Sequence, residues 1–503
     1  MKRNLYHSLV WFLPLLFGCG QVASTPVAAL QAQENVAPQT SKAPSGDTAA
    51  AAVAENTGHD WPIFLGPHGN GVSDETGLLD EWPDEGPAVL WEKRIGKGYS
   101  APSVLGDKLV IHHRQRDRDI IDCVRVQNGD VVWTYAYDTN FSDPYGYSNG
   151  PRCTPLLTKT RCYTFGAQGR LVCLGLESGE LIWEHDTAKE WNVPDHFFGA
   201  GCTPILEGEL LIVLVGGQPN SGVVAFNAET GKVVWESVGQ KTWDGVDTDQ
   251  PGGRFKWTSS EMVVSYSSPL IATIHGQRHL LCLVRQGLVS LDPATGKENF
   301  KYWFRARVKE SVNAARPVVV GDLVFLSAAY ETGAAMLKVQ PDGQSYDVVW
   351  RKKRGMSTHW STAIYDDGCL YGFSGRHEEE AMLQCIDVNT GDLVWETNGY
   401  QGTGNLRLNN AGDVIDTAGR PVTYFGRGSM TKADGKYYLL GERGVLVLAT
   451  LSREKYQLIS RASYKQIRYP AWAAPVIAQG RLYLRSEDHL LSLNIAKTPA
   501  QDR

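Results

Sequence analysis

A short strand–turn–strand unit recurs along this chain, and it limits the possible folds more than any other feature. The copy at residues 223–235 reads VVAFNAETGKVVW. It combines an apolar β-rich run, a turn in which Gly231 supplies a positive φ, and a second strand that ends on Trp235. A hairpin this short cannot bury its own faces. It has to stack against copies of itself, so we expect a repeat architecture.

Copies of the unit end on a tryptophan at similar intervals. A looser copy ends at Ile459, and a last one stops at Ile495 before any closing aromatic residue. A tryptophan buries about 150 to 250 Å², so we interpret the repeated tryptophan as a device that packs one sheet on the next. An isolated strand near the N-terminus contributes one further tryptophan, Trp91. The predicted blade-packing set is Trp91, Trp133, Trp183, Trp235, Trp303, Trp350 and Trp395.

Each copy follows a second block made of small residues, a turn and an apolar strand, as in SAPSVLGDKLVI at residues 100–111. Together the two blocks give four strands per unit, with the small-residue strand innermost and the tryptophan strand outermost. Eight units predict an all-β fold, an eight-bladed β-propeller of four-stranded antiparallel blades. The eighth unit lacks an outer strand, whereas GPAVLWEKRI at residues 86–95 is an outer strand without a blade. We therefore expect this N-terminal strand to close the last blade, which removes an open sheet edge.

The N-terminus has the features of an export signal over residues 1–19. Lys2 and Arg3 precede an apolar run at residues 9–17 that is too short to span a bilayer. The ending LFGC resembles the bacterial lipobox, in which the cysteine, here Cys19, is acylated and anchors the protein to the membrane. Because Gly20 follows in place of Asp, this resemblance implies an outer-membrane lipoprotein that faces the periplasm. The alternative is an ordinary cleaved signal and a secreted protein.

Composition divides the rest of the chain into three parts. Residues 20–58 are rich in Ala, Thr, Gln, Pro and Ser and predict a disordered linker. Residues 59–497 form the predicted propeller, which we expect to be monomeric, and residues 498–503 a C-terminal tail. The net charge of −6 and the lack of long basic runs argue against nucleic acid as a partner.

The blocks ETGKVVW, ATGKENFKYW and NTGDLVW resemble the repeats of PQQ-repeat propellers, and the resemblance extends over residues 61–495. That family includes quinoprotein alcohol dehydrogenases and non-enzymatic lipoproteins of the BamB type that act in outer-membrane assembly. The resemblance implies the fold. It implies two different functions, because the same repeat serves an enzyme and a scaffold.

The dehydrogenase interpretation requires a chemical site, which in that family comprises adjacent cysteines, a calcium ion and an aspartate base. No two cysteines are adjacent here. Cys153 and Cys202, which both precede Thr-Pro, leave a disulfide or a soft-metal site open; the alternative is that they are structural thiols. The acidic loop DGVDTD at residues 244–249 lacks calcium-loop spacing and is interpreted as solvated. We predict no catalytic residue, no metal site and no resident cofactor, with PQQ and calcium as the alternative.

A propeller has a funnel at one end of its axis, and residues that lead into the innermost strands line it. Arginines with aromatic side chains suit an anionic or planar ligand, because Arg offers a bidentate fork and the rings offer a stacking face. The alternative is that these side chains pack together and plug the channel. If PQQ binds, Arg152 and Arg427 are the candidates for its carboxylates, and Trp360 or Trp472 for stacking. The candidate ligand funnel is Arg152, Tyr266, His359, Trp360, Arg427 and Trp472, flanked by Tyr99, Phe198 and Asn313.

The sequence thus favours a lipid-anchored propeller that binds envelope proteins as a scaffolding module. Exposed loops at residues 240–263 and 397–425 are the expected recognition surfaces, since loops on a rigid scaffold carry function more readily than its strands. Two alternatives remain open. One is a PQQ-dependent dehydrogenase of an alcohol or polymer, and the other is a carbohydrate-binding propeller that uses the aromatic funnel.

Overall fold

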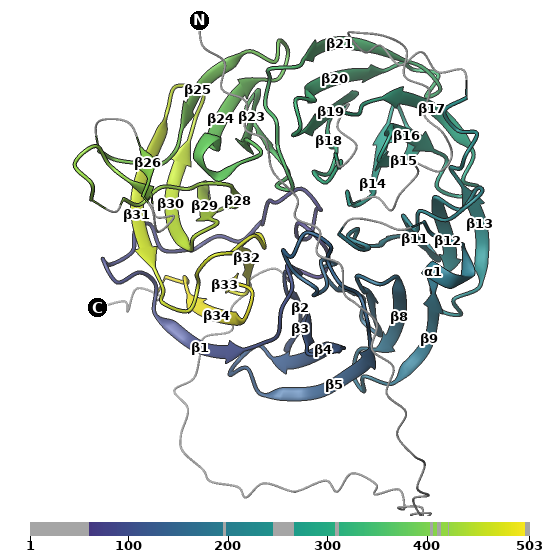
Figure 1. Ribbon diagram of the computed structural model, residues 1–503, viewed down its shortest axis with the longest axis horizontal. Coiled ribbons are helices and arrows are strands. Elements are labelled where there is room, and N and C mark those ends of the chain that lie inside the picture. The colour runs from purple at the N-terminus through teal and green to yellow at the C-terminus, as the bar shows by residue number, and fades with distance from the viewer. Residues whose placement is uncertain are drawn as a thin grey trace, which may run out of the picture. The chain divides into compact units, whose positions relative to one another are not determined.

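The computed structural model describes residues 60–194, 198–244, 266–306, 311–402, 406–409, 414–420 and 422–497. Within these ranges the backbone forms eight four-stranded antiparallel sheets arranged as blades in a ring (Figure 1). The predicted export signal, Cys19, the linker and the C-terminal tail lie outside the described residues. No helix among the described residues is long and apolar enough to cross a membrane.

The first four blades each contain four strands that follow one another in the chain from the hub to the rim. Blade 1 comprises β2 (Ser103–Leu105), β3 (Lys108–Gln115), β4 (Arg118–Arg125) and β5 (Val131–Asp138). Blade 2 comprises β6 (Leu156–Leu157), β7 (Arg161–Phe165), β8 (Arg170–Gly175) and β9 (Leu181–Asp186), followed by the short helix α1 (Thr187–Glu190). Blade 3 comprises β10 (Ile205–Glu207), β11 (Leu210–Val213), β12 (Val223–Asn227) and β13 (Val233–Ser237), and blade 4 comprises β14 (Leu270–Ile274), β15 (Gln277–Val284), β16 (Gly287–Leu291) and β17 (Glu298–Trp303).

The next three blades repeat this order. Blade 5 comprises β18 (Val318–Val320), β19 (Leu323–Ala328), β20 (Gly333–Val339) and β21 (Tyr346–Lys352). Blade 6 comprises β22 (Ile364–Asp366), β23 (Cys369–Ser374), β24 (Met382–Asp387) and β25 (Leu393–Thr397), with a 3-10 turn at Glu378–Glu380. Blade 7 comprises β28 (Gly428–Ala433), β29 (Lys436–Gly441), β30 (Val445–Leu451) and β31 (Tyr456–Ser463), preceded by a separate hairpin of β26 (Arg407–Leu408) and β27 (Val414–Ile415).

The eighth blade joins the two ends of the propeller, as predicted. Its inner strands are β32 (Val476–Ala478), β33 (Arg481–Arg485) and β34 (His489–Asn494), and β1 (Val89–Arg94) pairs antiparallel with β34 as the outermost strand (Figure 1). The buried guanidinium of Arg485 also donates to the carbonyl oxygens of Ser100 and His112, which ties blade 8 to blade 1. Closure therefore uses main-chain pairing and a buried arginine together.

Six of the predicted blade-packing tryptophans make the same contact with the next blade. Each Nε1 donates to a backbone carbonyl in the last turn of the neighbouring blade, at 2.8–3.1 Å. The indole of Trp235 lies so close to Gly296 in that turn that a Cβ there would approach the ring to 2.4 Å, and Gly296 also has a φ of +70°. These six are Trp91, Trp133, Trp183, Trp235, Trp350 and Trp395.

A β-bulge in each outer strand sets the position of the tryptophan. In blade 3 Trp235 pairs with Ala225, but the next pair is Val233 with Phe226, so Val234 is the extra residue. The same shift occurs in the outer-strand pairing of the other seven blades. A bulge bends the strand and re-aims a side chain, here at the turn of the next blade.

The strand pairing in blade 4 shows that Trp303 does not belong to the blade-packing set. In blade 4 the residue opposite Ser290 is Phe300, so Phe300 occupies the position that tryptophan holds elsewhere. Trp303 lies at the end of β17, half-buried, with its ring 5.5 Å from that of Trp243. Because phenylalanine has no N–H, the link to blade 5 uses other donors: His275 Nε2 contacts the carbonyl oxygen of Val339 at 3.0 Å.

Blade 7 has no tryptophan in its outer strand, and the N-terminal segment supplies one. The register places Ser460 at the tryptophan position. Trp82 lies against this site: its backbone N–H donates to Ser460 Oγ at 2.8 Å, and its buried ring packs 5.9 Å from Tyr438. Tyr483 of blade 8 packs on Trp91 at the same distance. The segment before β1 thus completes the seventh blade, and β1 completes the eighth.

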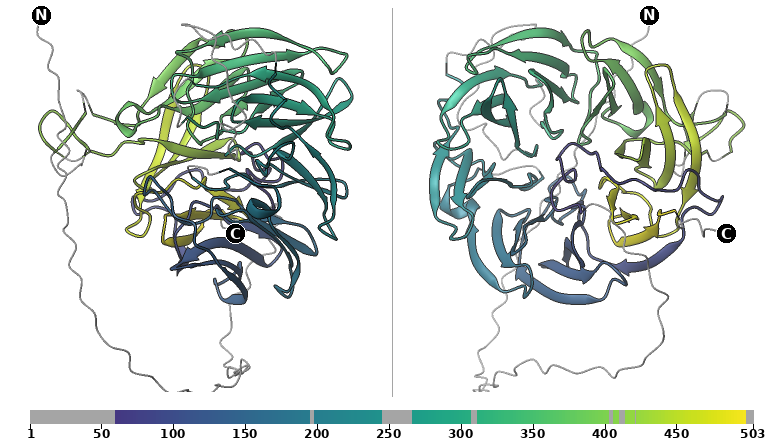
Figure 2. Two further views of the ribbon diagram at one scale, coloured as in Figure 1. Left: turned by 45° about the vertical axis from the view of Figure 1, so that its right-hand side comes forward. Right: turned by 180° about the vertical axis from the view of Figure 1, so that it is seen from behind.

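The same segment crosses one end of the ring, where Figure 2 shows it running across the centre. Trp61 forms an antiparallel bridge with Val104 in the inner strand of blade 1, and Val72 bridges Lys432 in that of blade 7. Between these points Arg316 Nη1, next to blade 5, donates to the carbonyl oxygen of Gly69 at 2.8 Å. The segment is therefore attached to the inner strands of blades 1 and 7 and, through Arg316, to the blade 5 side of the hub, which is opposite blade 1.

Small hydroxyl residues join the inner strands to one another. Thr203 Oγ1 accepts the backbone N–H of Thr154 in the preceding blade at 3.1 Å, and Ser268 Oγ accepts that of Thr203 at 2.8 Å. Where the strands converge, larger side chains would hold them apart. The small-residue blocks of the sequence are therefore needed for close approach at the hub.

We expect Trp82→Ala to lower the free energy of unfolding by about 3–5 kcal/mol, the usual range for removing a buried large aromatic side chain. Trp303→Ala is the matched control and should cost clearly less, because Trp303 is half-buried and outside the blade-packing register. Chemical unfolding of both variants measures the difference. Equal losses would contradict the role assigned to Trp82.

Glu75 gives a pH dependence with a defined sign. Its buried carboxylate accepts the N–H of Gly480 at 2.7 Å, yet burial raises its pKa to about 7. The folded state therefore holds the proton more tightly than the unfolded chain, and stability falls as pH rises from about 4.5 to 7. We expect Glu75→Gln to match the wild type near pH 4.5 and to be more stable above pH 7, by an amount on the order of 3 kcal/mol. Unfolding curves across this pH range measure it, and a difference that does not change with pH would contradict the assignment.

Candidate functional site

A cavity of about 290 Å³ lies at the hub, and side chains from several blades surround it. Phe64 and Leu65 of the N-terminal segment form part of its wall. The predicted funnel side chains therefore do not fill the hub, and a space for a ligand remains between them. The aromatic side chains on the wall, apart from Phe64, are Tyr99, Tyr145, Tyr147, Phe198, Tyr266, Tyr330, Trp360 and Trp472.

All six residues of the predicted ligand funnel lie on this wall. They are Arg152, Tyr266, His359, Trp360, Arg427 and Trp472. Tyr99 and Phe198 join them, but Asn313 does not. The side-chain amide of Asn313 donates to the carbonyl oxygens of Val284 and Phe304 at 3.0 and 2.9 Å, so Asn313 stabilises the backbone of blade 4. Whether the six residues bind a ligand stays a prediction.

Arg427 lies between two indoles. Its Cζ is 4.9 Å from the ring centre of Trp360 and 5.1 Å from that of Trp472. Its Nε and Nη2 donate to the carboxylate of Glu442, which has no exposed side-chain surface and also accepts Trp472 Nε1 at 3.0 Å. Burial alone would lower the pKa of Arg427, but the hydrogen bonds and charge of Glu442 outweigh it and raise the pKa. Arg427 is thus already neutralised and holds the two indoles in place.

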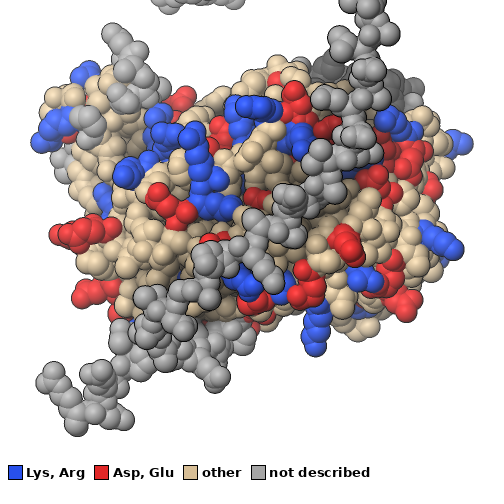
Figure 3. Space-filling model, turned by 90° about the horizontal axis from the view of Figure 1, so that it is seen from below, with Lys and Arg blue, Asp and Glu red and all other residues tan. Residues whose placement is uncertain are grey.

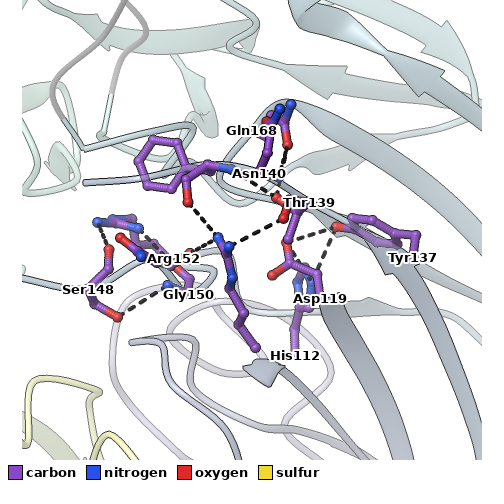
Figure 4. Close-up of polar contacts among 12 residues, drawn as sticks. His112, Asp119, Tyr137, Thr139, Asn140, Ser148, Gly150, Arg152 and Gln168 are labelled. Atoms are coloured by element: carbon purple, nitrogen blue, oxygen red, sulfur yellow. Dashed lines mark hydrogen bonds and ion pairs between the residues drawn. The ribbon is translucent and has the colours of Figure 1, made fainter. Parts of the chain in front are cut away.

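Arg152 is paired in the same way on another part of the wall. It donates to the carbonyl oxygens of Ser148 at 2.9 Å and Gly150 at 2.6 Å, both labelled in Figure 4. Its Nη2 also lies 3.2 Å from the carboxylate of the buried Asp143. Burial lowers the pKa of Arg152, and Asp143 opposes this. Both arginines predicted to bind a ligand's carboxylates are therefore paired with buried carboxylates of the chain.

A buried polar cluster lies close to Arg152 in blade 1. Asp119 lies beside Tyr137 and His112 in Figure 4, and the Tyr137 hydroxyl donates to Asp119 Oδ2 at 3.3 Å. Burial raises the pKa of Asp119 to about 7 and lowers that of His112. None of the three lies on the cavity wall. They belong to the interior of blade 1.

Arg376 is the arginine on the wall that sequence reasoning missed. Its Cζ lies 4.4 Å from the ring centre of Tyr330, and no carboxylate of the described residues forms an ion pair with its guanidinium. The Tyr330 hydroxyl is 3.2 Å from Nε2 of His359, whose pKa burial and the nearby arginines lower to about 3. His359 is therefore neutral at physiological pH, and Arg376 provides the unneutralised positive charge.

The position of Arg376 explains why it was missed. Arg376 and His377 lie in the loop between the second and third strands of blade 6, and Tyr330 lies in the corresponding loop of blade 5. These loops open on the same end of the ring as the loops that lead into the innermost strands. The predicted funnel comprises only residues of the latter loops. The run GRHEEE at residues 375–380 has the composition of an exposed hairpin, and His377 is exposed, yet His377 also lines the cavity.

The cysteines and acidic loops supply no further chemistry among the described residues. Cys153 and Cys202 are buried free thiols, and burial raises the pKa of Cys153 to about 12, which disfavours the thiolate that a metal needs. The described residues contain no group of three or more His, Cys, Asp or Glu able to hold a metal ion. Of the loop DGVDTD only Asp244 lies within the described residues.

The surface charges are mixed. On the face drawn in Figure 3, Lys and Arg lie among Asp and Glu, with no extended area of one sign. Such a face lacks the continuous basic patch of nucleic-acid-binding proteins. The expectation that this chain does not bind nucleic acid stays a prediction.

The model of one protein family matches a large part of the propeller. The family is described as outer membrane protein assembly factor BamB, and the matches cover residues 141–245 and 244–473. Among curated relatives, a quinone-dependent alcohol dehydrogenase subunit of Gluconacetobacter polyoxogenes is 22% identical over 304 residues, which is 55% of this chain and 35% of the relative. The chain therefore spans only about a third of the length of that enzyme subunit.

Solved structures of a BamB protein and of a quinohemoprotein alcohol dehydrogenase share the fold of this chain. BamB from Moraxella catarrhalis superposes with a TM-score of 0.52 at 14% identity, over 81% of this chain and 99% of that one. The quinohemoprotein alcohol dehydrogenase of Comamonas testosteroni gives 0.55 at 12% identity, over 88% and 82%. At such identities the likeness concerns the fold alone.

We expect Glu442→Ala to lower the free energy of unfolding by about 3–5 kcal/mol, because it leaves the half-buried Arg427 without its partner. Asp138→Ala is the control; it removes the partner of Arg118 from an exposed pair and should cost about 1 kcal/mol or less. Chemical unfolding followed by tryptophan fluorescence measures both. A cost for Glu442→Ala no larger than the control would contradict the pairing described.

Proposed function

The chain belongs to the family of outer membrane protein assembly factor BamB, and from that premise we propose that it is a protein-binding propeller of the cell envelope. The observation that carries the proposal is the chemistry of the hub. Its two predicted ligand arginines are paired with Asp143 and Glu442, and the described wall of the cavity contains no carboxylate. Such a wall offers contact surface, whereas it offers no acidic group to act as a general base.

The N-terminus and the family support the proposed envelope location. The LFGC sequence supports acylation of Cys19, and the linker at residues 20–58 would hold the propeller away from the membrane. With the BamB family match, this supports an outer-membrane lipoprotein whose propeller faces the periplasm. The loops at residues 240–263 and 397–425 are proposed as contact surfaces for partner proteins.

The second candidate is a PQQ-dependent dehydrogenase. It is favoured by the similarity to the quinone-dependent alcohol dehydrogenase subunit and by the indoles of Trp360 and Trp472, which suit a planar ring. Calcium in such a site would need oxygen ligands, ideally carboxylates. The described lining has no Asp, Glu, Asn or Gln side chain, and both predicted carboxylate-binding arginines already have acidic partners. The described residues therefore do not fit a calcium–quinone pair.

Site-specific photo-cross-linking in the intact envelope tests the binding function. A photoreactive residue at Lys241 or at Gln401, on the two proposed contact loops, is expected to capture discrete envelope proteins. The same residue at Val233, on the outer rim of blade 3, is the control and should capture none of them. Absence of cross-links at both loops would contradict the proposed function.

Titration with PQQ tests the second candidate. We expect no saturable binding at high micromolar PQQ, with or without calcium, and no dye-linked alcohol oxidation. Saturable binding that requires calcium, together with alcohol oxidation, would establish the dehydrogenase instead.

A further inference from the structure

The described wall of the hub cavity combines arginines with side chains that carry hydroxyl groups. Arg376 presents a guanidinium, which can only donate. Trp360, also on the wall, has a buried indole N–H without a hydrogen-bond partner among the described residues. No Asp, Glu, Asn or Gln side chain lies on the described wall. A ligand carboxylate would therefore meet donors and no acidic side chain on this wall.

Small hydroxyl residues at the hub provide further hydrogen-bonding groups. Ser268 Oγ accepts the backbone N–H of Thr203, and Thr362 Oγ1 accepts that of Arg316 at 3.1 Å. Both hydroxyls line the cavity, and their own hydrogens remain to be donated. Each hydroxyl oxygen also keeps a second lone pair, so these groups can donate to a ligand or accept from it.

The electrostatics point in the same direction. Three arginines line the described wall, but Arg152 and Arg427 are neutralised by Asp143 and Glu442. Arg376 is not, and its guanidinium stacks on Tyr330 with its edge available for a bidentate bond. A cation would meet no counter-charge here. A neutral sugar would leave the charge of Arg376 without a counter-charge, so a ligand with a carboxylate fits better.

The rim of the cavity extends the contact surface beyond the cavity itself. Tyr145, Tyr147 and Tyr469 are 47%, 50% and 46% exposed, although large apolar surfaces are usually buried. Tyr469 packs 6.0 Å from Trp472, and Arg443 lies 5.5 Å from its ring. Tyrosine, tryptophan and arginine are the residue types enriched at protein interfaces and their hot spots. The cavity volume is at the lower end of the roughly 300–1,000 Å³ of small-molecule sites, so it suits one anchoring side chain.

We propose that the cavity is a docking pocket for one aromatic side chain of a partner polypeptide, and that an Asp or Glu beside it in the partner pairs with Arg376. The rim tyrosines would contact the residues on either side of the anchor. This inference rests on the proposed protein-binding function and assigns it a site and a partner chemistry: an acidic segment with an aromatic residue.

Short synthetic peptides with capped ends test this directly by calorimetric titration of the full propeller. The probe has a central Phe flanked by Glu in a Gly/Ser sequence; matched peptides carry Lys in place of Glu, or Ala in place of Phe. We expect the probe to bind at least about tenfold more tightly than either matched peptide. Arg376→Gln should remove that preference for Glu over Lys, whereas Arg118→Gln, an exposed arginine of blade 1, should keep it. Tyr147→Ala, at a half-exposed position, should weaken all binding without unfolding the protein.

Several results would overturn the inference. They are equal affinity for the Glu and Lys peptides, unchanged binding in Arg376→Gln, or binding of PQQ or maltotriose in place of the peptide. Failure of the peptides with cross-links retained at Lys241 or Gln401 would remove the cavity as the docking site and leave the proposed function standing. Loss of those cross-links as well would remove the function itself.

Discussion

Contact between the closing indole of one blade and the last turn of the next is the interaction on which the ring depends. The indole supplies both buried apolar area and an N–H bond to a backbone carbonyl, and in five of the six contacts a glycine in the turn makes the close approach sterically feasible. Each blade touches only its neighbours, so a ring of blades is stable only if every junction is made. The two junctions without this indole contact are completed in other ways, by Trp82 from the N-terminal segment and by Phe300 with His275.

A rigid ring fixes the positions of side chains that are distant in the sequence. Arg152 comes from the start of blade 2, Arg427 from the start of blade 7 and Arg376 from a loop of blade 6, yet all three line one cavity. Buried acids neutralise two of them and leave the third charged. The charge of Arg376 is therefore the feature on which the proposed docking pocket rests, and the described wall carries no acidic side chain.

Much of the fold could be predicted because the repeat period is visible in the sequence. Eight blades and closure by β1 followed from counting strands, and both are confirmed. Trp303 was predicted as the blade-packing residue of blade 4 because it is a tryptophan. The spacing from the turn glycine identifies the correct residue: Trp235 lies four residues after Gly231, and Phe300 lies four residues after Gly296. Trp82 could not be predicted, since nothing local indicates that it packs in a blade formed some 350 residues later, at Tyr438.

The candidate site was predictable in its aromatic and basic residues but not in its charge balance. Residues before each inner strand lead to the funnel, so Trp360, Arg427 and Trp472 were found. Glu442 was not, because it lies after β29 and reaches Arg427 across its own blade. A pairing of this kind depends on the fold of two loops, and no sequence spacing indicates it.

The most direct test of the charge balance at the hub is a double-mutant cycle between Arg427 and Glu442, with each replaced by Met and stability followed by chemical unfolding. If Arg427 is neutralised within the protein, each single variant leaves a buried charge unpaired, and the double variant should recover a large part of the loss, a coupling of about 1–3 kcal/mol. Additive losses would show that the two groups do not depend on each other. Arg427 would then be free to pair with a ligand, which contradicts a hub whose predicted ligand arginines are already neutralised.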